Sequence, residues 1–219
     1  MADTFVRNTL KSNNHTVSPD WETLIRKKGA QLPHWTCANA IYHVVLRLSD
    51  SLPTAVLEEF HAERQAIITN AAKMKRELTE YEEQRLKWLY SEKVEQYLDA
   101  GYGECYLRQS AIAELVQQVL QFFDTERYTL HCWCLMPNHV HVIVEPKPGF
   151  TLSKIKHSWT SYSATRANAI LNRTGQFWQH EPYDHIIRNE KEYRFLLEYV
   201  WRNPEQAGLT SWKWRGIRE

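Results

Sequence analysis

Residues 128–146 constrain the fold of this chain more than any other segment. They hold two apolar runs, YTLHCWCLM and HVHVIVE, separated by Pro137-Asn138, a pair typical of turns. In the second run valine and isoleucine alternate with His139 and His141. Side chains of a β-strand point alternately to its two faces, so the sequence predicts both imidazoles on one face and the valines on the other. Burying two imidazoles side by side costs free energy unless their nitrogens find partners.

The remaining pattern predicts an α+β domain. Apolar periodicity indicates strands at residues 40–48, 128–136, 139–145 and about 183–187, and helices at 54–78, 79–100, 110–126, 151–171 and 190–202. The last helix is expected to stop before Asn203-Pro204, because a residue that precedes proline avoids the α region.

With the two helices at about 54–100 set aside as an inserted hairpin after the first strand, the order is βαββαβ plus a final helix. That order is typical of the ferredoxin-like fold, an antiparallel sheet with helices on one face. Valines 140, 142 and 144 are then expected to face those helices, with His139, His141 and Ile143 on the other side.

Length and composition favour one main domain. The chain has 219 residues and a mean hydropathy of −0.57, and it holds no apolar stretch of membrane-spanning length and no signal-peptide core. The predicted organisation is an irregular leader at 1–35 that packs on a domain at 36–219. The predicted location is the cytoplasm, with no membrane partner.

Charge is divided unevenly. Residues 54–104 hold 7 Lys and Arg against 11 Asp and Glu, whereas residues 150–219 hold 11 against 7. A polyanionic partner would therefore favour the C-terminal third.

Cysteine offers one alternative, a structural zinc site made by Cys132, Cys134, His131 and His139. The C-x-C spacing differs from the usual C-x2-C pairs of such sites. Strand alternation also places His131 and Cys132 on opposite faces, which opposes this interpretation.

The last predicted helix carries Tyr199 and Asn203, four residues apart and therefore on one helical face. Taken alone, this pair has an ordinary structural interpretation, in which Tyr199 is core and Asn203 caps the helix. The His-Val-His run and the Tyr-x-x-x-Asn-Pro helix occur in one chain, however. That combination resembles the HUH endonucleases, and more closely the REP-associated tyrosine transposases, which are single-tyrosine relatives of insertion-sequence transposases. The matching blocks are YHVVLRL, WCLMPNHVHVIVEP, GQFWQHEPYDHIIR and EYVWRNPEQAGL, which lie in the expected order within residues 34–209.

The resemblance implies a role for each matching residue. Tyr199 is the expected nucleophile, His139 and His141 the expected metal-binding pair, and Asn203 the expected third ligand. Two imidazoles and an amide oxygen are neutral, so a bound Mg²⁺ or Mn²⁺ would keep nearly all of its charge for a phosphate. No side chain is identified as the general base.

The implied partner is single-stranded or hairpin DNA of the repetitive palindromic (REP) type, and the implied host compartment is the bacterial nucleoid. A monomer is favoured over a dimer. The implied reaction is nicking and joining through a 5′-phosphotyrosine; the alternative is a hairpin-binding protein with little or no cleavage. The candidate DNA-binding residues are His43, Arg47, Lys154, Lys156, Arg173, Tyr183, Arg188 and Arg202. For His43, a buried core histidine is the competing interpretation.

Overall fold

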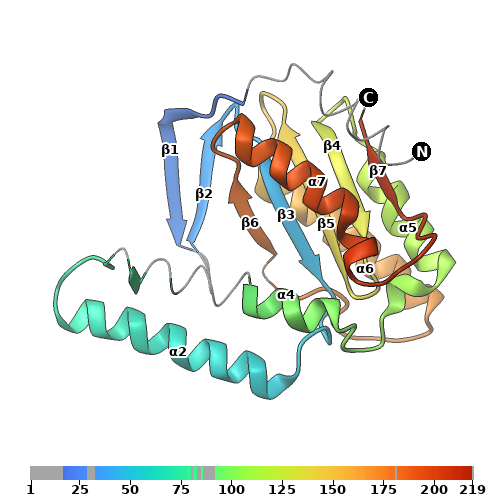
Figure 1. Ribbon diagram of the computed structural model, residues 1–219, viewed down its shortest axis with the longest axis horizontal. Coiled ribbons are helices and arrows are strands. Elements are labelled where there is room, and N and C mark those ends of the chain that lie inside the picture. Colours follow the sequence, from blue (N-terminus) through green and yellow to red (C-terminus); the bar gives the residue numbers. More distant parts are fainter. Residues whose placement is uncertain are drawn as a thin grey trace.

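A five-stranded antiparallel sheet lies at the centre of the molecule (Figure 1). The computed structural model describes residues 17–28, 33–79, 81–82, 85, 92–180 and 182–218. The sheet order is β6-β3-β5-β4-β7. Its strands are β3 (Tyr42–Arg47), β4 (Tyr128–Leu135), β5 (His139–Pro146), β6 (Tyr183–Ile186) and β7 (Arg215–Ile217). The sequence predicted the first four and missed β7.

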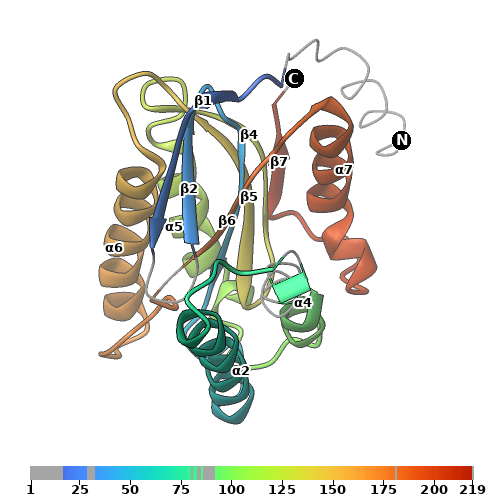
Figure 2. The same ribbon diagram turned by 90° about the vertical axis from the view of Figure 1, so that its left-hand side faces the viewer.

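One face of the sheet is covered by α5 (Ser110–Gln121) and α6 (Leu152–Ile170), as Figure 2 shows. Val140, Val142 and Val144 of β5 are fully buried in this layer, where they join the main apolar core with residues of both helices. The alternation predicted for β5 is therefore confirmed. Chain order and sheet pairing agree with the predicted α+β architecture.

The other face carries α7 (Glu190–Gln206), which lies across the sheet from α5 and α6 (Figure 2). Leu197 and Val200 pack there against Ile143 and the cysteines of β4. The helix begins after Asn189, whose side chain accepts a hydrogen bond from the Glu192 amide at 3.0 Å. The helices of the fold thus cover both faces, with α7 on the histidine side.

The prediction that α7 stops before Asn203-Pro204 is wrong, because the helix continues to Gln206 with Pro204 inside it. Pro204 removes only its own amide donor, and the chain downstream still closes the last turn. The amide of Ala207 donates to the Asn203 carbonyl and that of Leu209 to the Pro204 carbonyl. Asn203 is consequently held on the helix, one turn after Tyr199.

A bulge in β4 overturns the alternation assumed for His131 and Cys132. The β4–β5 register shifts between Leu130 and Cys132, so that His131 is an extra residue. Both side chains then lie on the α7 side: His131 contacts Tyr193, and Cys132 joins the α7 core cluster. The strand-alternation argument against a zinc site fails at this point.

The predicted leader at 1–35 is not wholly irregular. Residues 1–16 and 29–32 lie outside the described part, but β1 (Asp20–Lys28) and β2 (Pro33–Ala38) form an antiparallel two-stranded sheet beside β6 (Figure 1). The division of the chain at residue 35 stays a prediction.

The insertion after β3 is helical, as expected. It comprises α2 (Thr54–Lys73) and α4 (Glu92–Asp99), and a short 3₁₀ turn, η1 (Tyr106–Arg108), leads on to α5. Much of the predicted second helix, 79–100, lies outside the described residues. Its capping box is present, because the Thr79 amide donates to Glu82 at 2.9 Å. No helix within the described residues is long and apolar enough to cross a membrane.

The edge strand β7 provides a test of this packing. A Cβ on Gly216 would lie 2.6 Å from Nε1 of the buried Trp133 side chain. Gly216→Ala should therefore lower the free energy of unfolding by about 1–3 kcal/mol, as overpacking does, in urea denaturation. Trp133→Phe removes the clashing ring atoms, so the double variant should lose clearly less than the sum of the two single variants. Full additivity would contradict the predicted clash.

Candidate metal and nucleophile site

Pairing of β3 with β5 places the predicted site residues on one face of the sheet. Arg47 lies opposite His139, Val45 opposite His141 and His43 opposite Ile143. Residues directly opposite in an antiparallel pair point to the same face, so His43 and Arg47 share the face of the two histidines. This is the face that α7 covers.

Three imidazoles form a row on this face. Nε2 of His139 lies 3.0 Å from Nε2 of His141, and Nδ1 of His141 lies 3.1 Å from Nε2 of His43. The rings of His43 and His141 are nearly parallel, whereas those of His139 and His141 are almost perpendicular. The two Nε2 atoms of the predicted metal pair thus face each other.

Burial sets the protonation of these histidines. It lowers the pKa of His43 and of His139 to about 3 and that of His141 well below its usual range, with neighbouring positive charge adding to the effect. For His139 the added charge is the guanidinium of Arg47. At neutral pH the imidazoles are therefore uncharged, the form in which histidine binds a metal.

Tyr199 lies against this row. Its ring meets His141 edge-on with centroids 5.5 Å apart, and it meets His43 in the same way at 6.4 Å. The Phe195 ring lies nearly parallel to that of Tyr199, with centroids 6.4 Å apart, and is 66% exposed. The expected nucleophile and metal pair, far apart in the sequence, are therefore neighbours in the fold.

Asn203 is buried on the same helix, and its Oδ1 has no hydrogen-bond partner among the described residues. Such an acceptor costs free energy, and most native structures avoid it. An amide oxygen can instead coordinate a divalent cation. The unsatisfied oxygen and the facing imidazoles thus form a donor set that fits the predicted metal.

Asn138 and Phe195 are site residues that sequence reasoning missed. The Oδ1 of Asn138 lies 2.8 Å from Nδ1 of His139. The sequence signal for Asn138 was the MPN that precedes the histidines, which was used as a turn indicator and as part of the family resemblance. Nothing in the sequence distinguished Phe195 from the core aromatic residues.

The candidate DNA-binding residues are spread over several surroundings. His43 and Arg47 are buried in the site, and Lys156 is buried in an ion pair with Asp184. The other five are an exposed Lys154, Arg173 over the Tyr106 ring, Tyr183 against the inserted helices, Arg188 paired with Glu192, and Arg202 paired with Glu198. Trp178 belongs to the main core.

The zinc alternative receives no support from the geometry. His131 is occupied by Tyr193 at 2.8 Å and by Glu145 at 3.4 Å. No group of three or more His, Cys, Asp or Glu within the described ranges is arranged to hold a metal ion. The site described above has only two such ligands and depends on the amide of Asn203 for its third.

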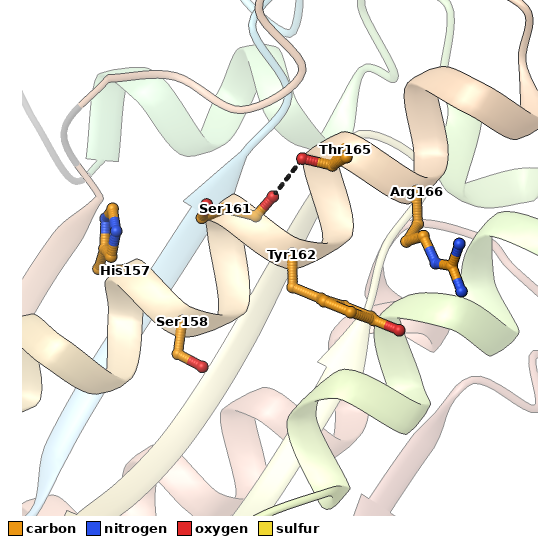
Figure 3. Close-up of a pocket in the computed structure, with 6 residues that line it drawn as sticks. All are labelled: His157, Ser158, Ser161, Tyr162, Thr165 and Arg166. Atoms are coloured by element: carbon orange, nitrogen blue, oxygen red, sulfur yellow. Dashed lines mark hydrogen bonds between the residues drawn. The ribbon is translucent and has the colours of Figure 1, made fainter.

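A separate pocket lies on α6, lined by His157, Ser158, Ser161, Tyr162, Thr165 and Arg166 (Figure 3). These residues follow the outer face of the helix, where the Thr165 hydroxyl donates to the Ser161 carbonyl at 3.0 Å. Because α6 packs on the valine side of β5, this pocket is on the opposite side of the sheet from the histidines.

Comparison with protein families gives an independent result. The family described as "Transposase IS200 like" matches residues 102–203. The match contains His139, His141 and Tyr199, and it ends at Asn203. Residues 102–203 are therefore similar to the IS200-like transposases. His43 and Arg47, on β3, precede the matched segment.

The chain is also similar to individual proteins. An uncharacterised protein of Haemophilus influenzae is 23% identical over 141 residues, covering 46% of this chain and 76% of that protein. The REP-associated tyrosine transposase of Escherichia coli is 26% identical over 84 residues, covering 38% of this chain and about half, 48%, of that protein. A solved structure of a REP-associated tyrosine transposase bound to a REP hairpin overlaps with a TM-score of 0.43 and 14% identity, over 83% of this chain and 76% of that one. This overlap is too low to assign a role to any individual residue of this chain.

Asn203 provides a stability test for the site. Asn203→Leu removes a buried unsatisfied oxygen, so it should raise the free energy of unfolding of the metal-free protein by about 1 kcal/mol, measured by urea denaturation in EDTA. Asn189→Leu is the matched control on the same helix. It removes a satisfied cap and should lower stability by about 1 kcal/mol. Equal losses in both variants would mean that Asn203 Oδ1 has a structural partner.

Proposed function

We propose that this protein is a metal-dependent endonuclease and strand transferase for single-stranded DNA, acting on REP-like hairpins through a 5′-phosphotyrosine. The observation that carries the proposal is the contact between Tyr199 on α7 and His141 on β5, whose Nε2 faces that of His139. Both residues lie within the segment that matches the IS200-like family.

The residues that would hold the metal are His139, His141 and Asn203. A bound Mg²⁺ or Mn²⁺ would supply positive charge to stabilise the scissile phosphate as it is attacked. Position on the helix also favours a cation, because Asn203 lies in the last turn of α7, where the helix dipole is negative. The neutral imidazoles add no charge that would weaken this effect.

The chemical step assigned to Tyr199 is a displacement at phosphorus. Its phenolic oxygen forms a bond to the phosphorus, and the bond from phosphorus to the 3′-oxygen breaks. The phenol loses its proton, and the departing oxygen gains one to become a 3′-hydroxyl. The phosphotyrosine keeps the energy of the broken phosphodiester, so that attack by a 3′-hydroxyl rejoins the strand.

The substrate class comes from relatives. The Escherichia coli relative is named a REP-associated tyrosine transposase, and palindromic DNA is the matching substrate to test for this chain. The exposed Lys154 remains a candidate phosphate contact. Arg188 forms an ion pair with Glu192, and Arg202 forms one with Glu198. DNA phosphates would have to displace these carboxylates to bind either arginine.

Tyr199→Phe should abolish covalent attachment to DNA, because the nucleophilic oxygen is lost. The measurement is denaturing electrophoresis of the protein after incubation with a labelled single-stranded REP-like hairpin and Mn²⁺. The wild type should give a DNA-linked band that disappears in EDTA.

The matched control is Tyr193→Phe, which removes a hydroxyl from a buried tyrosine of the same helix. This variant should keep the covalent band. Band formation by Tyr199→Phe would assign the nucleophile elsewhere. Tight hairpin binding by the wild type without any band, in either metal, would instead favour a hairpin-binding protein that does not cleave.

Phe195 adds a proposed contact beside the nucleophile. It is a large apolar side chain that α7 exposes rather than buries, one turn before Tyr199. Aromatic faces of this kind stack on unpaired bases. We assign Phe195 to a base next to the cleaved phosphate.

Phe195→Ala should weaken binding of single-stranded hairpin flanks by about 1–3 kcal/mol, because one stacked base loses its platform. Fluorescence anisotropy with a labelled oligonucleotide measures the change. Phe122→Ala is the control, since Phe122 is also exposed but lies at the end of α5, on the opposite side of the sheet. Equal losses in both variants would contradict the assignment.

A further inference from the structure

We propose that Asn138 and His43 are positioning residues for one cation: Asn138 holds His139 with its Nε2 lone pair free, and His43 accepts the Nδ1 proton of His141 in a hydrogen bond when His141 binds the cation through Nε2. The inference rests on the proposed metal site, and it concerns residues that the family match does not assign. His43 lies outside the matched segment altogether.

The orientation of the Asn138 amide is fixed by its neighbours. Its Nδ2 donates to the carbonyl oxygen of Tyr102 at 2.9 Å, and its Oδ1 lies 2.8 Å from Nδ1 of His139. A carbonyl only accepts hydrogen bonds, so the nitrogen of the amide must face Tyr102 and the oxygen must face His139. Asn138 is fully buried, and water offers it no alternative partner.

This orientation determines the tautomer of His139. An amide oxygen accepts, so Nδ1 of His139 must carry the proton and donate it to Asn138. In the neutral ring Nε2 then carries no proton and has a free lone pair. A ligating histidine whose other nitrogen donates to an oxygen is the arrangement that orients imidazoles in metal sites.

His141 has a different partner, since its Nδ1 faces Nε2 of His43 at 3.1 Å. Without metal, the lone pair on His139 Nε2 requires a proton on His141 Nε2, 3.0 Å away. Nδ1 of His141 then accepts a hydrogen bond from the Nε2–H of His43. The row is internally satisfied, with every hydrogen bond pointing from His43 towards His139.

For both Nε2 atoms to bind a metal, the hydrogen bond between His141 and His43 must reverse its direction. His141 must carry its proton on Nδ1 and donate it to Nε2 of His43, which becomes the acceptor while Nδ1 of His43 takes the proton. The number of protons on the two rings is unchanged. An imidazole is suited to this position, because the same atom can act as donor in one state and as acceptor in the other.

Burial makes the effect of His43 specific. His43 is 5% exposed and His141 has no exposed surface, so water cannot replace the hydrogen bond if the imidazole is removed. A phenylalanine at this position would fill the volume but leave Nδ1 of His141 without an acceptor. His141 would then be held in the wrong tautomer for binding through Nε2.

The first test uses the metal-free protein labelled with ¹⁵N-histidine, in which two-bond nitrogen–proton correlations report each tautomer. The wild type should show a proton on Nδ1 of His139 and on Nε2 of both His141 and His43. Asn138→Leu should abolish the preference of His139 for the Nδ1 proton. A proton on Nε2 of His139 in the wild type would overturn the inference.

The second test measures Mn²⁺ affinity by calorimetry. His43→Phe should bind Mn²⁺ roughly 10- to 100-fold more weakly than the wild type, the range for removal of a residue that orients a ligand. His43→Gln keeps an amide oxygen that can accept from His141 and should recover most of the affinity. His131→Phe, a buried histidine of β4 away from the row, is the control for destabilisation and should bind normally.

The outcomes separate this inference from the proposed function. Absence of Mn²⁺ and Mg²⁺ binding by the wild type would reject the metal site, while the tautomers of the metal-free protein would still test Asn138 and the histidine row. Normal binding by the wild type and by His43→Phe would reject the positioning role of His43 and leave the metal site intact.

Discussion

The antiparallel pairing of β3 with β5 is the constraint on which the site depends. It sets Arg47 opposite His139 and brings His43 diagonally beside His141, so that strands far apart in the sequence contribute one row of buried side chains. A register shift of one residue would send the whole set to the valine face. The valines prevent such a shift, because the face towards α5 and α6 is fully buried and accepts only apolar side chains. The apolar core on one face of the sheet thereby fixes the positions of the polar residues on the other face.

That polar row is costly to fold. Imidazoles lose hydration on burial, which the lowered pKa values of His43 and His139 reflect, and Asn203 adds an unsatisfied oxygen. Hydrogen bonds between the rings and to Asn138 offset part of this cost. The remaining free-energy cost falls on the site between α7 and β5. Native proteins commonly tolerate such local costs at functional sites. The preorganised geometry is what the cost provides, since ligands need not rearrange to meet a cation.

The sequence was sufficient to predict the features that follow from periodicity and from motif resemblance. The faces of β5, the α+β architecture and the neighbourhood of His139, His141 and Tyr199 follow from alternation, helical spacing and motif resemblance. Sequence reasoning failed where tertiary contacts override local preference. Pro204 stays helical because later amides close the turn, and His131 changes face because of a bulge that alternation cannot signal. The role of Asn138 depends on Tyr102, a distant partner in the sequence, and therefore could not be predicted from the turn or from the motif.

The inserted helices also bear on the site. Val45 projects from β3 on the histidine face, directly opposite His141, and it packs with Val56 and Phe60 of α2 and with Val94 and Leu98 of α4. Tyr183 of β6 joins the same cluster. The insertion thus closes the histidine face on the side away from β4, while α7 covers the part over β4 and β5. Because Val45 lies between His43 and Arg47 on one strand face, loosening the insertion would expose the row to water. Hydration would weaken the ring-to-ring hydrogen bonds that hold the imidazoles in register, so the insertion supports the site through exclusion of solvent rather than through a contact of its own.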